Sequence, residues 1–250
     1  MVTTVLVTGA SSGFGQACVR KFAENGHKVI LAARRQDRIE ALADSLGDAA
    51  HGITLDVRDR TAVFKAIEQL PESFSDVGIL INNAGLALGM GGAQEADVDE
   101  WDTMVDTNVK GVMYMCRAVL PGMLERGGGH VVNIGSVAAS WPYAGGNTYG
   151  STKAFVQQFS RNMRVDLLGK NVRVTNVEPG MSETEFSVVR FSGDEDKARQ
   201  FYAGMKPLGA EDVAEIVYWT TALPAHININ QLEVMPANQS WQGFAVHRDS

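Results

Sequence analysis

The sequence predicts an α/β fold: one doubly wound domain with a seven-stranded parallel sheet and helices on both faces. Two observations support this prediction. Short apolar runs alternate with longer amphipathic segments, and these runs lack the strict alternation of a strand with one solvated face. Parallel strands joined by right-handed helical crossovers give the doubly wound arrangement, or Rossmann fold. The predicted strands are 3–8, 28–33, 51–55, 78–82, 129–134, 172–177 and 231–235. The predicted helices are 14–25, 36–46, 59–70, 99–125, 149–168 and 211–222.

The chain has no linker, low-complexity tract or internal repeat, so we expect residues 1–250 to form a single domain. Segment 182–210 departs from the helix–strand rhythm because it is polar and irregular. Such a segment inside a compact α/β domain typically forms a lid or a binding loop, here over a substrate site. The C-terminal tail, 236–250, keeps Trp241 and Phe244 outside the core pattern, and we expect it at a subunit interface.

Composition excludes several classes of function. The net charge of −7, without a long lysine/arginine cluster, argues against a nucleic-acid partner. No run of 18 apolar residues is present, so we expect no membrane span. The first residues lack the pattern of a secretion signal, and two distant cysteines predict reduced, buried thiols, so we expect a cytoplasmic protein. The five histidines show no metal-ligand spacing, which predicts no metal site.

A glycine-rich turn follows the first predicted strand and opens the first predicted helix. This context suits a dinucleotide, because small residues let the backbone approach a pyrophosphate and a helix N-terminus favours its negative charge. The spacing Gly-x-x-x-Gly-x-Gly alone also fits a tight turn that merely needs glycine. The candidate cofactor-binding residues of this turn are Gly9, Ser11, Ser12, Gly13, Phe14 and Gly15.

The second predicted strand ends in Arg34 and Arg35 rather than in a carboxylate. A carboxylate there would bind the ribose hydroxyls of NAD, whereas arginine suits the 2′-phosphate of NADP, so we predict NADP(H). The alternative is two solvated arginines at a helix start. Asp56 and Val57 close the third strand. Asp56 either accepts a hydrogen bond from adenine or caps the helix that begins near Asp59.

Tyr149 and Lys153 stand one turn apart on one face of the predicted helix 149–168. A neighbouring ammonium favours phenolate and lowers the pKa of a tyrosine, which makes such a pair an acid–base catalyst. Ser136 follows a predicted buried strand, where its hydroxyl is held rigidly enough to bind a substrate oxygen. Alone, the Tyr-x-x-x-Lys pattern also fits a tyrosine at a helix start beside a solvated lysine.

Further motifs occur in the later part of the chain. They are Asn82-Asn83-Ala84-Gly85, Asn108, Asn133 and Pro179-Gly180 with Thr184. Together with the glycine turn and with Ser136, Tyr149 and Lys153, they resemble the short-chain dehydrogenase/reductase family over residues 1 to about 235.

The resemblance implies an NADP-dependent enzyme acting on CH–OH groups. Tyr149 would exchange a proton with the substrate oxygen, Lys153 would lower its pKa and hold the nicotinamide ribose, and Ser136 would polarise that oxygen. Asn108 would place a water in a proton path to solvent; alternatively, it only satisfies backbone groups. Beside Tyr149 and Lys153, the residues implied to contact the cofactor are Asn83, Ala84, Gly85, Pro179, Gly180 and Thr184.

Two stretches are expected to border the substrate. Residues 141–147, with Tyr143 as the candidate, lie between the serine and the tyrosine and so must line the pocket, although their proline and glycines also fit a rigid turn. In the predicted lid, Arg190 is the candidate for binding an anion, because a guanidinium binds a carboxylate or sulfonate with two donors. The alternative is a surface arginine paired with Asp194 or Glu195.

These stretches, with 223–230 and 234–236, resemble the NADP-dependent 3-hydroxy acid dehydrogenases, which act on serine, allo-threonine and 3-hydroxypropionate or its semialdehyde. The resemblance implies a small anion-bearing hydroxy acid or aldehyde as substrate. Residues 181–183 depart from the expected glycine-rich form, which leaves sulfoacetaldehyde reduction to isethionate open; Glu183 there would repel a second negative charge or receive an ammonium. A general carbonyl or acyl-carrier reductase and an inactive dinucleotide-binding regulator are further alternatives.

The family also implies a homotetramer, built through the helices 99–125 and 149–168 and the last strand. Both helices carry more apolar residues than one buried face needs. This surplus indicates either a partner helix or burial against the sheet.

Overall fold

A computed structural model describes residues 3–191, 193–241 and 246. Its centre is a seven-stranded sheet in the order β3-β2-β1-β4-β5-β6-β7, and every neighbouring pair is parallel. The predicted doubly wound fold is therefore confirmed. The strands are β1 (Thr4–Thr8), β2 (Lys28–Ala33), β3 (Ala50–Thr54), β4 (Val77–Asn82), β5 (Gly129–Ile134), β6 (Val172–Pro179) and β7 (Gln231–Val234).

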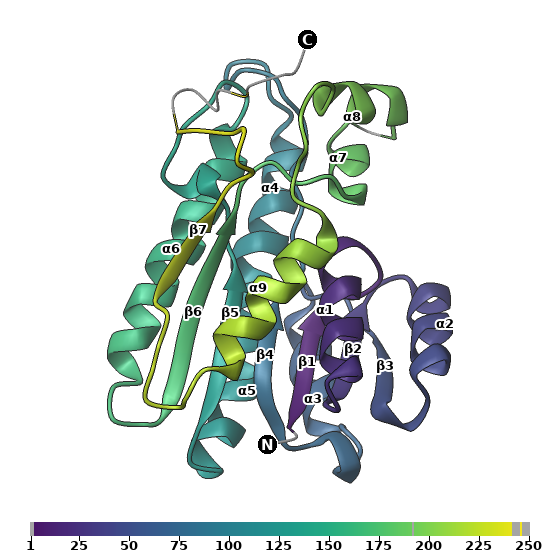
Figure 1. The fold of residues 1–250 in the computed structure, drawn as a ribbon, viewed down its shortest axis with the longest axis vertical. Helices are drawn as coiled ribbons and strands as arrows, with labels where there is room; N and C mark the ends of the chain where they lie inside the picture. Colours follow the sequence, from purple (N-terminus) through teal and green to yellow (C-terminus); the bar gives the residue numbers. More distant parts are fainter. Residues whose placement is uncertain (1–2, 192, 242–245, 247–250) are drawn as a thin grey trace.

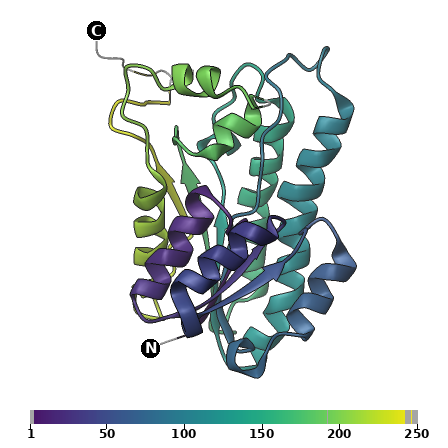
Figure 2. The ribbon, with the colours of Figure 1, turned by 90° about the vertical axis from the view of Figure 1, so that its right-hand side faces the viewer.

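Helices cover both faces of the sheet, which Figure 2 shows nearly edge-on between two layers. The helices are α1 (Gly13–Glu24), α2 (Gln36–Leu46), α3 (Arg60–Glu68), α4 (Val98–Val105), α5 (Val112–Glu125), α6 (Asn147–Asp166), α7 (Glu185–Arg190), α8 (Glu195–Phe201) and α9 (Ala210–Ala222). Short 3₁₀ turns occupy Gly47–Ala49, Glu72–Phe74 and Val137–Ala139. One apolar cluster joins the sheet to α1, α2 and α9, and a second joins it to α3, α5 and α6.

Strand β1 illustrates why the strands could be recognised. All five of its residues are buried. Val5 and Val7 pack into the first apolar cluster, whereas Leu6 packs into the second. Because both faces of the strand enter a core, its three central residues form a continuous apolar run, with a buried threonine at each end.

The predicted helix 99–125 is three elements rather than one. Helix α4 is followed by a π-helical segment, Asp106–Gly111, before α5 begins. A Cβ added at Gly111 would lie 2.7 Å from Cγ2 of Val57. Glycine therefore lets this segment approach the loop that follows β3. Such a widened turn depends on tertiary contacts, which an apolar period does not report.

The segment 182–210 is more regular than the sequence predicted, because it contains α7 and α8. Each helix begins at a side-chain cap: Thr184 accepts a hydrogen bond from the Phe186 N–H, and Asp194 accepts one from the Lys197 N–H. Figure 1 shows both helices at the end of the molecule where the arrowheads of the strands point. The segment therefore lies over the carboxyl ends of the sheet.

The tail returns to the start of that segment. The Gln239 side chain accepts a hydrogen bond from the Met181 N–H at 2.7 Å, directly after β6. Trp241 and Trp141 both donate to the carboxylate of Glu233, so the described part of the tail packs on its own subunit. Phe244 lies outside the described residues. Among the residues described, no helix has the length and hydropathy needed to cross a bilayer.

Candidate functional site

A cavity of about 650 Å³ opens at the carboxyl ends of β1, β2, β4, β5 and β6. This is the edge where doubly wound sheets bind ligands, because the loops after neighbouring strands diverge there. Every candidate site residue predicted from the sequence lines this cavity except Gly15 and Asn108. The fold thus brings together segments that lie far apart in the chain.

The glycine turn after β1 is packed against the motif after β4. Gly9 has φ +66°, and a Cβ there would lie 2.9 Å from Cα of Ala84. A Cβ at Gly15 would lie 2.3 Å from the Gly9 carbonyl oxygen, so Gly15 supports the turn from within rather than lining the cavity. Thr8 Oγ1 accepts the N–H groups of Asn83 and Ala84 at 3.0 and 2.9 Å. Neither glycine tolerates a side chain.

The N-terminus of helix α1 faces the cavity. Its N-cap residue, Ser12, makes no side-chain capping bond, and Gly13 and Phe14 of the first turn line the cavity wall. The first N–H groups of the helix therefore have no capping side chain and carry the partial positive charge of the helix terminus.

The two arginines after β2 have different surroundings. Arg35 donates to Ser11 Oγ at 3.0 Å, to Ser12 Oγ at 2.6 Å and to Glu185 at 2.9 Å. The exposed Arg34 side chain lines the cavity and makes no hydrogen bond or salt bridge within the described residues. Arg34 is therefore the arginine free to accept a new anion.

Asp56 lines the cavity but does not cap α3. Asp59 is the cap, because its carboxylate accepts the Ala62 N–H at 3.0 Å. Asp56 instead accepts hydrogen bonds from the Arg58 side chain, and these bonds lower the pKa of the Asp56 carboxyl against the opposing effect of burial. Of the two roles left open for Asp56, the capping role is thus excluded.

Tyr149, Lys153 and Ser136 meet on one wall. Lys153 Nζ lies 5.8 Å from the centre of the Tyr149 ring and donates to the Ile134 carbonyl at 2.8 Å. Ser136 is the N-cap of the 137–139 turn and lines the same wall. Lys153 is buried, so the solvated lysine of the alternative interpretation is excluded.

The electrostatics at this wall involve groups that the sequence does not predict. Burial raises the pKa of the Tyr149 phenol, while the Ser136 hydroxyl and the charge of Arg190 lower it. Burial also lowers the pKa of Lys153 to about 8. The ammonium lies over the ring and is bound to a carbonyl. Ser136 and Arg190 therefore favour the phenolate, and the effect of Lys153 on the pKa of Tyr149 stays a prediction.

The Asn108 side chain is fully used within the fold. Its Oδ1 accepts the Leu86 N–H at 2.9 Å, and its Nδ2 donates to the Leu86 carbonyl at 2.8 Å and to Thr152 at 3.0 Å. The amide thus satisfies backbone groups, which was the alternative reading. Its role in a proton path stays a prediction.

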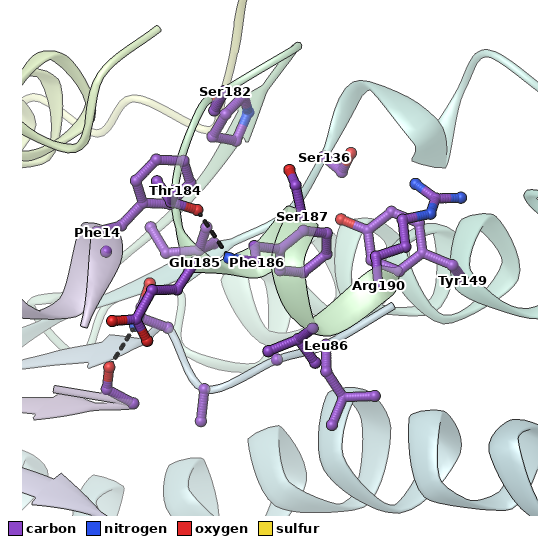
Figure 3. A pocket seen from close by; sticks show the side chains of 18 of the residues that line it. Phe14, Leu86, Ser136, Tyr149, Ser182, Thr184, Glu185, Phe186, Ser187 and Arg190 are labelled. Atoms are coloured by element: carbon purple, nitrogen blue, oxygen red, sulfur yellow. Dashed lines mark hydrogen bonds between the residues drawn. The ribbon is translucent and has the colours of Figure 1, made fainter. Parts of the chain in front are cut away.

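Arg190 lies inside the cavity instead of pairing on the surface. Its Nη2 donates to the Tyr143 hydroxyl at 2.7 Å, and its Cζ lies 5.2 Å from the Tyr143 ring centre. Of the two predicted alternative partners, Asp194 pairs with Lys197, and no salt bridge joins Arg190 to Glu195 among the described residues. Arg190 Nε is buried and has no hydrogen-bond partner among the described residues. Figure 3 shows the guanidinium beside Tyr149.

Some predictions for the substrate side are wrong in detail. Of residues 141–147, only Tyr143 and Ala144 line the cavity, and Trp141 turns away to Glu233. Met181 and Ser182 line the cavity, whereas Glu183 does not.

Sequence reasoning also missed several aromatic side chains. The Phe186 ring centre lies 5.7 Å from that of Tyr149, and Phe191, Phe201 and Tyr202 also line the cavity. Their only sequence signal was a cluster of aromatic residues in an otherwise polar segment.

Comparison with known proteins agrees with this geometry. The family model for short chain dehydrogenase matches residues 3–194. The chain is 57% identical over 245 residues to the NADP-dependent 3-hydroxy acid dehydrogenase YdfG of Shigella flexneri, covering 98% of this chain and 99% of that one. It is 52% identical to sulfoacetaldehyde reductase 2 of Chromohalobacter salexigens, with 100% of each chain covered. A solved closed form of serine dehydrogenase complexed with NADP⁺ superposes with a TM-score of 0.95 at 56% identity. The match covers 98% of this chain and 100% of that one.

Proposed function

Because the chain belongs to the short-chain dehydrogenase family, we propose that it transfers hydride between NADP(H) and a small hydroxy acid or aldehyde that carries an anion. One observation supports this function above the others. The guanidinium of Arg190 lies 5.8 Å from the ring centre of Tyr149, so an anion clamp and a proton donor share one wall. A substrate a few atoms long can reach both.

The cavity suits NADP(H). An uncapped helix start and glycines with no room for a side chain fit a pyrophosphate, and Arg34 offers an unpaired guanidinium for a 2′-phosphate. When bound, the cofactor supplies the hydride chemistry. Asn83, Ala84, Gly85, Pro179, Gly180 and Thr184 complete the wall that would hold it.

The residues of this chain provide acid–base chemistry and orientation. The Tyr149 phenol gives a proton to the carbonyl oxygen during reduction and takes one from the alcohol during oxidation. In the free protein the Ser136 hydroxyl lowers the pKa of that phenol, and when substrate is bound it would donate its one proton to the substrate oxygen instead. Lys153, fixed on the Ile134 carbonyl, holds the ribose beside Tyr149.

The substrate anion is bound by Arg190. Its buried Nε has no partner among the described residues, and a buried donor without a partner costs free energy until a ligand supplies an acceptor. A carboxylate would make this chain a 3-hydroxy acid dehydrogenase, and a sulfonate would make it a sulfoacetaldehyde reductase. Relatives of both kinds are more than 50% identical to it.

A substrate panel tests the proposal. NADPH oxidation would be followed with malonic semialdehyde, sulfoacetaldehyde and propionaldehyde, and NADP⁺ reduction with L-serine, L-allo-threonine and 3-hydroxypropionate. The proposal expects kcat/KM for at least one anionic compound to exceed that of propionaldehyde about tenfold or more. A neutral aldehyde turned over best would refute the anion clamp.

We further propose that segment 182–210 is the lid of this site. Its residues supply Phe186, Arg190 and Phe191 to the cavity wall, and Tyr202 braces it by donating to the Ser182 carbonyl at 2.6 Å. The serine dehydrogenase that superposes on this chain is a closed form with NADP⁺, and we infer that the lid is closed here as well.

A homotetramer remains our proposal for the assembly. Most apolar side chains of α5 and α6 are used in the second apolar cluster, but Met113 and Leu124 of α5 stay 39% and 38% exposed. Trp241 is one of the two aromatic residues for which the tail is predicted to lie at a subunit interface, and its side chain is 55% exposed. Light scattering on a size-exclusion column would show a monomer mass if this proposal is wrong.

The two cysteines are free and buried, which supports a reducing compartment such as the cytoplasm.

A further inference from the structure

Helix α7 bridges the two ends of the cavity. Glu185 is its first residue and Arg190 its last. Figure 3 shows Glu185 on the side of Phe14 and Arg190 on the side of Tyr149. One short helix of the lid therefore contacts the cofactor end with one charged residue and the substrate end with the other.

Glu185 is held by two arginines from outside the lid. Its carboxylate accepts a hydrogen bond from Arg35 at 2.9 Å and one from Arg38 at 2.6 Å. Burial would raise the pKa of Glu185, but these two bonds outweigh it and lower the pKa below its ordinary value. We call these three residues the Glu185 cluster. They tie the lid to the start of α2 across about 150 residues of sequence.

The start of α7 is also seated on the glycine turn. A Cβ at Gly13 would lie 3.3 Å from Cβ of Thr184, the N-cap of α7. Arg35 links the same places, because it donates to Ser11 and Ser12 as well as to Glu185. The orientation of α7 is thus fixed from the cofactor end of the cavity.

A helix of six residues does not form alone in water, because nucleation costs more than one turn of hydrogen bonds returns. Its position must come from its contacts. At the Arg190 end, the guanidinium meets only aromatic faces and the Tyr143 hydroxyl among the contacts described. The charged contact that fixes α7 is the Glu185 cluster.

We propose that Glu185 is a positioning residue: its carboxylate, bound to Arg35 and Arg38, holds α7 so that Arg190 meets the anion of the substrate. This inference rests on the proposed function for the role of Arg190. It also assigns different roles to the two arginines after β2. Arg34 is left to bind the cofactor phosphate, and Arg35 fixes the turn and the lid.

Amide hydrogen exchange of the free protein tests the positioning without any substrate. Glu185→Gln and Arg38→Gln each remove one side of the cluster, and Arg38 does not line the cavity. We expect α7 amides to exchange about fivefold faster in either variant, and the double variant to add little, because both changes break one interaction. Asp196→Asn is the matched control. It breaks an exposed lid salt bridge to Arg199 that lies within α8 and should leave α7 unchanged.

Kinetics provide the second readout. We expect the KM of an anionic substrate to rise about threefold in Arg38→Gln, with the KM of NADPH, kcat and turnover of propionaldehyde unchanged, since a partly exposed ion pair contributes modestly. Arg38→Lys keeps the positive charge, so its KM for the anionic substrate should lie close to that of the wild-type protein.

Two results would overturn the inference. One is unchanged α7 exchange in both single variants. The other is a KM increase that is equal for anionic and neutral substrates. These failures differ from failure of the proposed function, in which the wild-type protein would turn over no anionic substrate whatever α7 does.

Discussion

The Arg190 guanidinium lies over the Tyr149 ring, 5.8 Å from its centre, although the two residues come from the lid and from helix α6. A cation at this position stabilises phenolate, and its charge lowers the pKa of Tyr149 against the larger effect of burial. The residue proposed to bind the substrate anion therefore also tunes the proton donor. An anion that reaches Arg190 will partly neutralise this effect.

Tyr149→Phe tests the proton transfer. The ring and its packing on Phe186 stay, but the hydroxyl is lost. We expect kcat to fall on the order of 10² to 10⁴-fold, the usual contribution of a positioned acid or base. The dissociation constant of NADPH, measured by fluorescence, should change less than about twofold because the variant removes no phosphate contact. Tyr143→Phe removes a second phenol from the same wall and the acceptor of Arg190, so we expect KM for an anionic substrate to change while kcat falls far less than in Tyr149→Phe.

Arg190→Ala tests the anion clamp. A charge-assisted hydrogen bond contributes about 1.5–3 kcal/mol, so kcat/KM for malonic semialdehyde should fall about 10- to 100-fold. The kcat/KM for propionaldehyde should fall only slightly, through the change in the pKa of Tyr149. Arg190→Lys keeps the charge but loses the planar pair of donors, so its kcat/KM for malonic semialdehyde should lie between those of the wild-type protein and Arg190→Ala. Equal losses for both aldehydes would show that Arg190 does not contact the anion.

The strands and the catalytic wall could be predicted because their signals are local. Tyr149 and Lys153 are one helical turn apart, and the three central residues of β1 are apolar because both faces of the strand are buried. The fold class follows from the order of such elements. For these features, neighbouring residues carry enough information.

The remaining features depend on where distant segments meet. The contact of Glu185 with Arg35 joins residues 150 apart, and the approach of Gly111 to Val57 accompanies a π-helical turn. Neither has a period or spacing that a sequence can display. The contribution of Arg190 to the pKa of Tyr149 could not be predicted for the same reason, because the path of the lid decides where Arg190 lies.

Arg34→Ala tests cofactor selection. Arg34 makes no side-chain hydrogen bond or salt bridge among the described residues, and only its charge acts on Asp56, so its removal should disturb the fold little. We expect the KM of NADPH to rise about tenfold, the loss of roughly 1.4 kcal/mol, while the KM of NADH changes less than about twofold. Steady-state kinetics with both cofactors at saturating substrate measure this. A parallel rise for NADH would place the 2′-phosphate elsewhere.

His130 predicts how stability depends on pH. The ring lies buried in β5, with Nε2 2.7 Å from Thr175 Oγ1, and burial together with the charge of Arg173 lowers the pKa of His130 to about 3. The unfolded chain, whose histidine has a pKa near 6.5, binds more protons between these two values. The free energy of unfolding should therefore fall as the pH drops from about 6.5 toward 3, by an amount on the order of a few kcal/mol from this residue.

Urea unfolding at pH 7 and pH 4 measures that loss. His130→Asn cannot gain the proton, so we expect a smaller difference between the two pH values, although the variant is less stable at pH 7 because a buried ring is replaced by a smaller amide. Thr175→Val is the matched control: it removes the hydrogen-bond partner but leaves the ring buried, and burial is the main cause of the lowered pKa. The acid loss should persist in Thr175→Val. If it disappeared there and persisted in His130→Asn, another group would be the one that takes up the proton.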